Sequence, residues 1–271
     1  MPKHEPRYCK GDEIGGRYLV HEALAGGMSE IYLCLDLQTN YPFALKTFQP
    51  QYLTNPTVRT YFAREAGTWV AREKHPNVVR CFHMETVDNI PFLFLKWVAA
   101  GEGYCADLRD WLHRRGPLEP RRALEFTLDV CRALRHAQKK VPSFVHCDIK
   151  PANVLVDQGQ LAKLTDFGLV RLVRETGLIP YEETPAAGDR WQVASAGGTP
   201  RYMAPEQWRG EPVDTRTDVY SVGCLLYEML SGGGCPRRRR TKTSNGCIWR
   251  HRRLRSDRAL RSCRARDSIA C

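Results

Sequence analysis

The chain has 271 residues, and its content of 42% hydrophobic and 26% charged residues excludes disorder throughout, because such a chain can bury a core. No apolar run approaches the roughly 18 residues that span a bilayer, and the amino terminus lacks an apolar signal segment. We therefore expect a cytoplasmic chain without a membrane segment. The net charge of +11 lies wholly after residue 236, where twelve Arg and one Lys accompany two Asp. A charge excess confined to one tail argues against a folded nucleic-acid module, so no nucleic-acid partner is expected.

The first hundred residues predict a small β-rich half. Short β-like runs, separated by Gly, Pro and Asn, cover residues 17–25, 30–36, 42–49, 78–87 and 90–98. One helix interrupts these runs over residues 55–73, where Asn55 and Pro56 form an N-cap and first-turn signal.

Helical periodicity dominates from Asp107 onward and predicts a larger helical half. A long helix is expected over 120–139, where apolar residues recur at three- and four-residue steps. These residues are Leu124, Leu128, Cys131 and Leu134. A second helix is expected over 216–230, and its strongly apolar character predicts that it is buried. Its apolar residues are Val219, Val222, Leu225, Leu226 and Leu230.

The eleven Cys form no CxxC pair and show no even spacing, so neither a zinc site nor a disulfide framework is expected. Most of them are interpreted as reduced thiols that serve as small core residues. After residue 235 the composition changes abruptly to Arg, Ser and Cys, and we expect a disordered tail over 236–271. Translation in a shifted reading frame, or a gene fragment, is the hypothesis for this change, and resequencing the coding region tests it.

A dense polar loop, HCDIKPAN at 146–153, lies between two apolar runs and displays side chains suited to a site. Asp148 supplies a proton acceptor, Lys150 a cation and Asn153 a metal ligand within one short turn. Asp166 follows thirteen residues after Asn153 and adds a second hard-oxygen ligand of the kind that magnesium prefers.

Two charges in the first half occupy apolar surroundings. Lys46 lies in an expected strand beside Ala44 and Phe48, and Glu65 lies on the apolar face of the expected helix. Because a lone buried charge is costly, we expect Lys46 and Glu65 to pair.

Taken in chain order, these residues resemble the signature set of protein kinases. The motifs are FALK at 43–46, HPN at 75–77, HCDIKPAN at 146–153, DFG at 166–168, GTPRYMAPE at 198–206 and DVYSVG at 218–223. Each motif alone is a weak signal, whereas the complete ordered set is specific. The resemblance runs from about Arg17 to Gly232 and implies a two-lobed α+β fold. The implied parts are an N-terminal extension (1–16), an N-lobe (17–98), an incomplete C-lobe (99–235) and the tail (236–271).

The resemblance also implies an activity: transfer of the γ-phosphoryl group of ATP, with Mg²⁺, to a Ser or Thr hydroxyl of a protein substrate. Asp148 would orient the hydroxyl and accept its proton, and Lys150 would neutralise the moving phosphoryl group. Lys150 together with Thr199 is more similar to Ser/Thr kinases than to tyrosine kinases.

The nucleotide-binding roles follow from the same resemblance. Lys46 would hold the α- and β-phosphates and pair with Glu65, while Asn153 and Asp166 would hold magnesium. The glycine-rich hairpin of the family aligns with ALAGGMSEIY at 23–32, a form similar to bacterial members. Its expected nucleotide contacts are Ala23, Leu24, Ala25, Gly26, Gly27, Met28, Ser29, Glu30 and Ile31.

Several positions depart from the family pattern. Leu24 and Ser29 stand where the first and third glycines are usual, which should loosen or reposition ATP. Cys147 stands where Arg is usual, and a neutral thiol offers no charge-assisted pairing to a phosphate in the activation loop. We therefore expect activity that does not depend on such pairing, and Ala substitutions at Ser195 and Thr184 test this.

The C-terminal departure leaves an alternative open. No family-like helices follow residue 235, so Glu206 lacks its usual late Arg partner and the apolar faces of the 216–230 helix are left uncovered. A truncated, inactive pseudokinase-like interaction module is the alternative to the enzyme. A binder of nucleic acid or membranes that acts through the Arg tail is a third possibility, which deletion of residues 237–271 tests.

Overall fold

The computed structural model describes residues 5–26, 29–54, 74–99, 107–142, 144–167, 201–233, 239–243 and 246–250. The chain divides into two units, Met1–Gly234 and Cys235–Cys271, which are described separately below. The helix expected over 55–73 lies outside the described residues. No helix in the described part of the chain is both long and apolar enough to cross a membrane.

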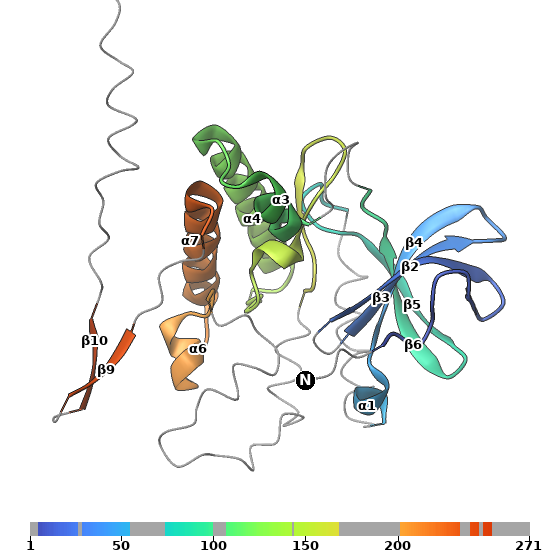
Figure 1. The fold of residues 1–271 in the computed structure, drawn as a ribbon, viewed down its shortest axis with the longest axis horizontal. Coiled ribbons are helices and arrows are strands. Elements are labelled where there is room, and N and C mark those ends of the chain that lie inside the picture. Colours follow the sequence, from blue (N-terminus) through green and yellow to red (C-terminus); the bar gives the residue numbers. More distant parts are fainter. Residues whose placement is uncertain are drawn as a thin grey trace, which may run out of the picture. The chain divides into compact units, whose positions relative to one another are not determined.

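The first unit begins with a six-stranded antiparallel sheet whose strand order is β1-β2-β3-β4-β6-β5 (Figure 1). Its strands are β1 Glu13–Ile14, β2 Tyr18–Gly26, β3 Ser29–Asp36, β4 Tyr41–Phe48, β5 Cys81–Val87 and β6 Ile90–Lys96. The strands expected over the first hundred residues are therefore confirmed. Strand β5 starts three residues later than the run 78–87 because Val78 instead forms an isolated parallel bridge with Leu164.

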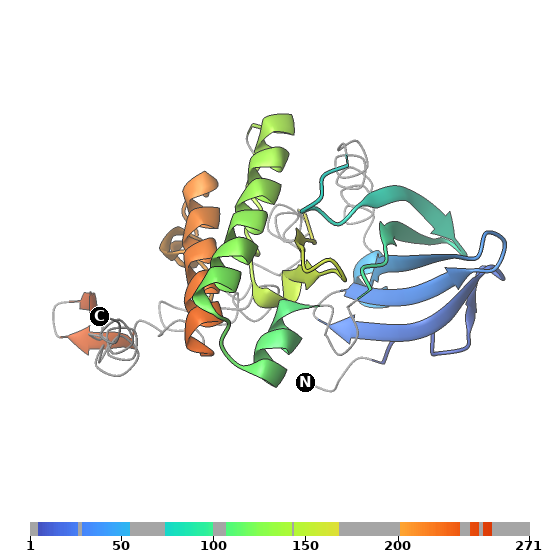
Figure 2. The same cartoon turned by 90° about the horizontal axis from the view of Figure 1, so that it is seen from above.

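Helices dominate the remainder of this unit. The helices among the described residues are α1 Pro50–Leu53, α3 Leu108–Arg115, α4 Pro120–Lys140, η1 Pro151–Asn153, α6 Pro205–Arg209 and α7 Thr215–Ser231. A short antiparallel hairpin of β7 Val154–Val156 and β8 Ala162–Leu164 lies between η1 and α6 in the sequence. Helices α4 and α7, both predicted, pack side by side (Figure 2).

The periodicity that predicts α4 does not identify its buried face. Leu124 and Leu128 are each 53% exposed, whereas Ala123, Phe126 and Val130 are buried. Helix α4 carries apolar residues on two faces, and small alanines rather than the larger leucines allow α7 and β8 to approach it.

The expectation that the whole apolar run of α7 is buried is wrong at its two ends. Val222 and Leu225 are buried, but Val219 is 69% exposed and Leu230 is 44% exposed. The physical reason is again that apolar residues surround the helix, while only one face packs against α4.

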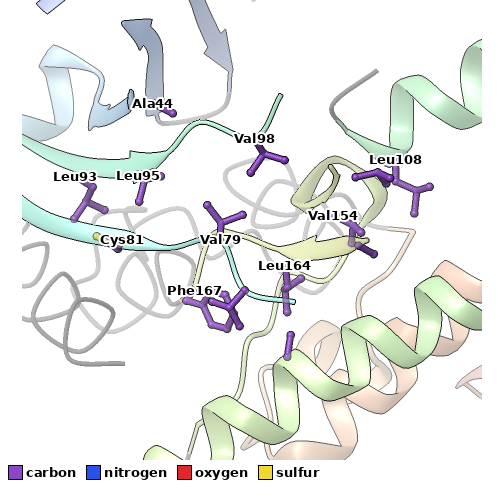
Figure 3. Close-up of a cluster of buried hydrophobic side chains, with 14 of the residues drawn as sticks. Ala44, Val79, Cys81, Leu93, Leu95, Val98, Leu108, Val154, Leu164 and Phe167 are labelled. Atoms are coloured by element: carbon purple, nitrogen blue, oxygen red, sulfur yellow. The ribbon is translucent and has the colours of Figure 1, made fainter. Parts of the chain in front are cut away.

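Buried apolar side chains continue from the sheet to the β7–β8 hairpin (Figure 3). The labelled members are Ala44, Val79, Cys81, Leu93, Leu95, Val98, Leu108, Val154, Leu164 and Phe167. Backbone hydrogen bonds join the same regions, because Val79 N–H donates to the Leu164 carbonyl at 2.9 Å and Leu164 N–H donates to the Asn77 carbonyl at 2.8 Å. The hairpin that precedes Asp166 is thus tied to the chain that enters β5.

The described cysteines are reduced. Cys34, Cys81, Cys147 and Cys224 are buried, as expected for core thiols, while Cys9 and Cys131 are exposed. Burial raises the pKa of the Cys34 and Cys81 thiols to about 12 in each case, so these two remain protonated at neutral pH.

Gly232 ends α7 in the left-handed conformation, with φ +68° and its N–H bonded to the Glu228 carbonyl at 2.9 Å. An added Cβ would lie 2.9 Å from Cδ of Pro117. Gly232→Ala is therefore expected to lower the free energy of unfolding by about 1–2 kcal/mol from the backbone alone, with the Pro117 clash adding to that cost. Urea unfolding measures the change. Gly233→Ala is the matched control, since its Cβ meets nothing within 4 Å; equal losses in both variants would contradict this explanation.

The second unit contains two antiparallel strands, β9 Arg239–Thr243 and β10 Gly246–Arg250, with Gly246 opposite Thr243. The expectation of a disordered tail does not hold for these strands. The overlooked signal is the presence of residues that favour strands, such as Thr241, Ile248 and Trp249, on both sides of a polar Ser-Asn pair. The rest of 236–271 lies outside the described residues, where that expectation stays a prediction.

Candidate active site

The polar loop 146–153 forms a connected cluster around Asp148. Lys150 Nζ lies 2.8 Å from Asp148 Oδ2, and Asn153 Nδ2 donates to the same oxygen at 2.9 Å. The Asn153 amide also donates to the Asp148 carbonyl oxygen at 2.8 Å. The turn of η1, with Pro151 at its start, brings the three side chains together. The structure thus brings Asp148, Lys150 and Asn153 together in this loop, as predicted.

Burial raises the pKa of the Asp148 carboxyl, and the nearby Lys150 ammonium partly offsets this effect. An ionised carboxylate with a raised pKa is a stronger proton acceptor than a solvent-exposed Asp. The environment of Asp148 thus suits a group that orients a hydroxyl and takes its proton.

Asp166 lies directly after β8 and its neighbour Thr165, and it forms an ion pair with the ammonium group of Lys46. Lys46 comes from β4 and is 1% exposed, so its charge is compensated within the protein. Burial alone would raise the pKa of Asp166, but the Lys46 ammonium outweighs it and holds that pKa below the usual range. Asp166 has φ 63°, a left-handed conformation that is uncommon outside glycine.

The expected partner of Lys46 was Glu65, which lies outside the described residues, as do Gly27, Met28 and Thr199. In the described part of the chain Lys46 contacts Asp166 instead. The resemblance places Lys46 and Asp166 at one site in separate roles and does not predict the contact between them.

The hairpin of β2 and β3 sorts the expected nucleotide contacts onto two faces. Leu24 pairs with Ile31, and Ile31 pairs with Lys46. Because directly opposed residues point to the same side of a sheet, Leu24, Ile31 and Lys46 share one face. By the same alternation Ser29 joins this face, opposite Gly26 and Phe48.

Ala23, Ala25 and Glu30 belong to the opposite face of the hairpin. Glu30 is fully buried and accepts a hydrogen bond from the Tyr32 hydroxyl at 2.6 Å. The carboxylate of Glu30 therefore lies on the face away from Lys46, and a nucleotide contact through this residue stays a prediction.

Asp218 of α7 binds the backbone of the 146–153 loop through its carboxylate. Its two carboxylate oxygens accept the N–H groups of His146 at 2.8 Å and of Cys147 at 2.9 Å. His146 in turn lies 2.9 Å from the Thr165 carbonyl through Nε2. The motif DVYSVG was found in the sequence without a role for its Asp. The available signal was a carboxylate in a helix that is expected to be buried, because a buried carboxylate requires hydrogen-bond partners.

Two departures from the family pattern have visible consequences. Cys147 is buried, so the position normally taken by Arg presents no charge. Glu206, expected to lack its usual late Arg, accepts a hydrogen bond from the Thr217 hydroxyl at 2.6 Å. Its carboxylate is therefore paired, although by a neutral group. Thr184 and Ser195 lie outside the described residues.

Comparison with known proteins shows the family of this chain. The family described as "Protein kinase domain" matches residues 20–258, which extends beyond the Gly232 limit expected from the motifs. The serine/threonine-protein kinase PknB of Mycolicibacterium smegmatis is 36% identical over 224 residues, covering 81% of this chain and 33% of the relative. The probable serine/threonine-protein kinase SCO3848 of Streptomyces coelicolor is 35% identical over 232 residues, covering 84% and 31%.

This chain therefore spans about a third of the length of these relatives. Among solved structures, the Mycobacterium tuberculosis PknI kinase domain matches with a TM-score of 0.62 at 23% identity, covering 87% of this chain and 82% of that one. That likeness shows the two-lobed α+β fold. The ordered motifs, the cluster at 146–153 and the family match together establish that the chain belongs to the protein kinase domain family.

Proposed function

We propose that this chain is a protein kinase that uses ATP and magnesium to phosphorylate Ser or Thr residues of a protein substrate. The observation that carries the proposal is the joint presence of the hydrogen-bonded cluster of Asp148, Lys150 and Asn153 and the Lys46–Asp166 ion pair. The two lobes of the kinase domain are proposed to span 17–98 and 99–235, after an N-terminal extension over 1–16. A cytoplasmic location and the lack of a nucleic-acid partner remain part of the proposal.

Phosphoryl transfer depends on alignment and charge neutralisation more than on a protein nucleophile. Asp148 Oδ2 is held by Lys150 and Asn153, which fixes the plane of the carboxylate. We assign the other oxygen, Oδ1, to orient the substrate hydroxyl and accept its proton. The Lys150 ammonium, 2.8 Å from the same carboxylate, is placed to neutralise charge near the transferred group.

The donor set fits magnesium. The Asn153 amide nitrogen bonds to Asp148, which leaves the amide oxygen as the ligand atom, and the lowered pKa keeps Asp166 ionised. In the described part of the chain no group of three or more His, Cys, Asp or Glu side chains forms a metal cluster, and magnesium is commonly held by one or two carboxylates plus substrate phosphates. Bound there, the ion would neutralise charge on the phosphate oxygens.

Acceptor specificity for Ser and Thr has two supports. The curated relatives carry names of serine/threonine-protein kinases. Lys150, two residues after Asp148, matches the pattern of that class and contacts Asp148 directly. The hairpin face of Leu24, Ser29 and Ile31 is proposed to cover the nucleotide, with Lys46 on its phosphates.

The proposal is tested by incubating the 271-residue chain with γ-labelled ATP and a generic basic protein, with magnesium or with excess EDTA. We expect magnesium-dependent label on phosphoserine or phosphothreonine of the basic protein or of the chain itself. Label on phosphotyrosine alone would overturn the acceptor class, and label that survives EDTA would overturn the role of Asn153 and Asp166.

A further inference from the structure

We propose that Gln207 is a positioning residue that sets the orientation of the peptide leading into Asp148, an inference that rests on the proposed kinase function. The carbonyl group of Cys147 belongs to the peptide that joins Cys147 to Asp148. Gln207 Nε2 donates to this carbonyl oxygen at 3.0 Å. The two residues are 60 positions apart in the sequence, so the contact links α6 to the catalytic loop through tertiary structure.

The side-chain amide of Gln207 is held at both ends. Its Oε1 accepts the N–H of Ala204 at 2.9 Å, while its Nε2 donates to the Cys147 carbonyl. Gln207 is only 6% exposed, and both of its hydrogen bonds are buried. A primary amide is suited to this double role because it carries an acceptor and a donor on one rigid plane.

The peptide that Gln207 contacts adopts a costly conformation. Cys147 has φ 65°, in the left-handed region that non-glycine residues seldom occupy, and such conformations persist only where the surroundings enforce them. Asp218 holds the N–H groups on the amino-terminal side of the strained residue, at His146 and Cys147. Gln207 holds the carbonyl on its carboxyl-terminal side. The N–H of the same peptide, that of Asp148, lies 3.3 Å from His146 Nδ1.

These contacts come from two helices, α7 and α6, and each helix holds a different part of the loop backbone. Asp218 fixes where the loop begins, whereas Gln207 fixes the rotation of the peptide from which the Asp148 side chain projects. Without the Gln207 donor, the buried carbonyl would lack that hydrogen bond and the strained peptide could relax. The Asp148 carboxylate would then shift relative to the substrate hydroxyl, and displacements of about 1 Å in a catalytic group can cost about 100-fold in rate.

Loss of the Gln207 hydrogen bond should affect nucleotide binding less than it affects the catalytic rate. Lys46 and Asp166 hold each other, and neither contacts Gln207 through any hydrogen bond among the described residues. The inference therefore predicts an effect on kcat with little effect on KM for ATP, which is the signature of lost alignment in the transition state.

Gln207→Glu and Gln207→Met separate this role from a structural one. Gln207→Glu retains an acceptor for the Ala204 N–H and, when ionised, places an oxygen without a proton beside the Cys147 carbonyl. Gln207→Met removes both hydrogen bonds at similar length and adds no charge. We expect kcat to fall about 10- to 100-fold in both variants, with KM for ATP within about twofold of wild type. Arg209→Ala, an exposed residue of the same helix that pairs with Glu211, is the control and should keep wild-type kcat.

The assay is transfer from γ-labelled ATP by the full 271-residue chain, beside thermal unfolding of each variant and an Asp148→Asn sample. If Gln207→Met, or Gln207→Glu assayed at a pH at which the glutamate is ionised, keeps wild-type kcat while Asp148→Asn is inactive, the positioning role is overturned and Gln207 only caps α6. If Asp148→Asn is as active as wild type, the proposed function itself fails. Should Gln207→Met not fold, Gln207→Glu decides, because it preserves the contact that α6 needs.

Discussion

Asp148→Asn is expected to lower kcat for protein phosphorylation by about 100- to 10,000-fold, the range attributed to a positioned general base. Asparagine has nearly the same shape and can still accept hydrogen bonds from Lys150 and Asn153, so the fold of the loop should persist. It cannot accept a proton from the substrate hydroxyl. Initial rates of label transfer at saturating ATP measure the loss.

The matched control is Asp110→Asn, which changes an exposed carboxylate on α3 in the same way. Its kcat should equal that of wild type, and its unfolding midpoint should match that of Asp148→Asn within experimental error. A rate for Asp148→Asn that stays close to wild type would remove this carboxylate from the chemistry.

Asp218→Ala is expected to lower the free energy of unfolding by about 2–6 kcal/mol, since each of two buried N–H groups that loses its carboxylate acceptor costs about 1–3 kcal/mol. Those groups belong to His146 and Cys147, and the carboxylate that accepts them is 1% exposed. A loss of this size is a large part of the stability of a typical domain, about 5–15 kcal/mol. Urea unfolding followed by tryptophan fluorescence measures it.

Asp214→Asn provides the comparison on the same helix. Asp214 is the exposed N-cap of α7, and asparagine caps helices as well as aspartate does. We expect a change within about 0.5 kcal/mol. Equal stability of the Asp218→Ala and wild-type chains would show that the loop backbone does not depend on α7.

Much of the fold followed from sequence periodicity. The strands β2 to β6 and the helices α4 and α7 lie within a few residues of their expected positions, because alternation and helical spacing are local properties. Burial was harder to predict. Leu124 and Leu128 satisfy the helical spacing of α4 yet remain exposed, since the face that packs is chosen by the neighbouring α7 and β8.

The site likewise contains contacts that the sequence predicts and contacts that it does not predict. Asp148, Lys150 and Asn153 were predictable as a cluster because they lie within one turn. The Lys46–Asp166 pair spans 120 positions, and the supports from Asp218 and Gln207 span 71 and 60. Such contacts depend on how distant elements pack. Glu30 shows a further limit, because its place in the hairpin motif predicts a nucleotide contact, while strand alternation turns its side chain to the face away from Lys46.

The proposed function requires Lys46, Asp148, Asn153 and Asp166 to converge on one magnesium-bound nucleotide. A crystal structure of this chain with magnesium and a non-hydrolysable ATP analogue tests it most directly. We expect a metal ion ligated by the Asn153 amide oxygen and the Asp166 carboxylate, with Lys46 Nζ on the phosphates and Asp148 near the terminal phosphoryl group. A nucleotide bound away from the Lys46 face of the hairpin, or a metal that contacts neither Asn153 nor Asp166, would contradict it.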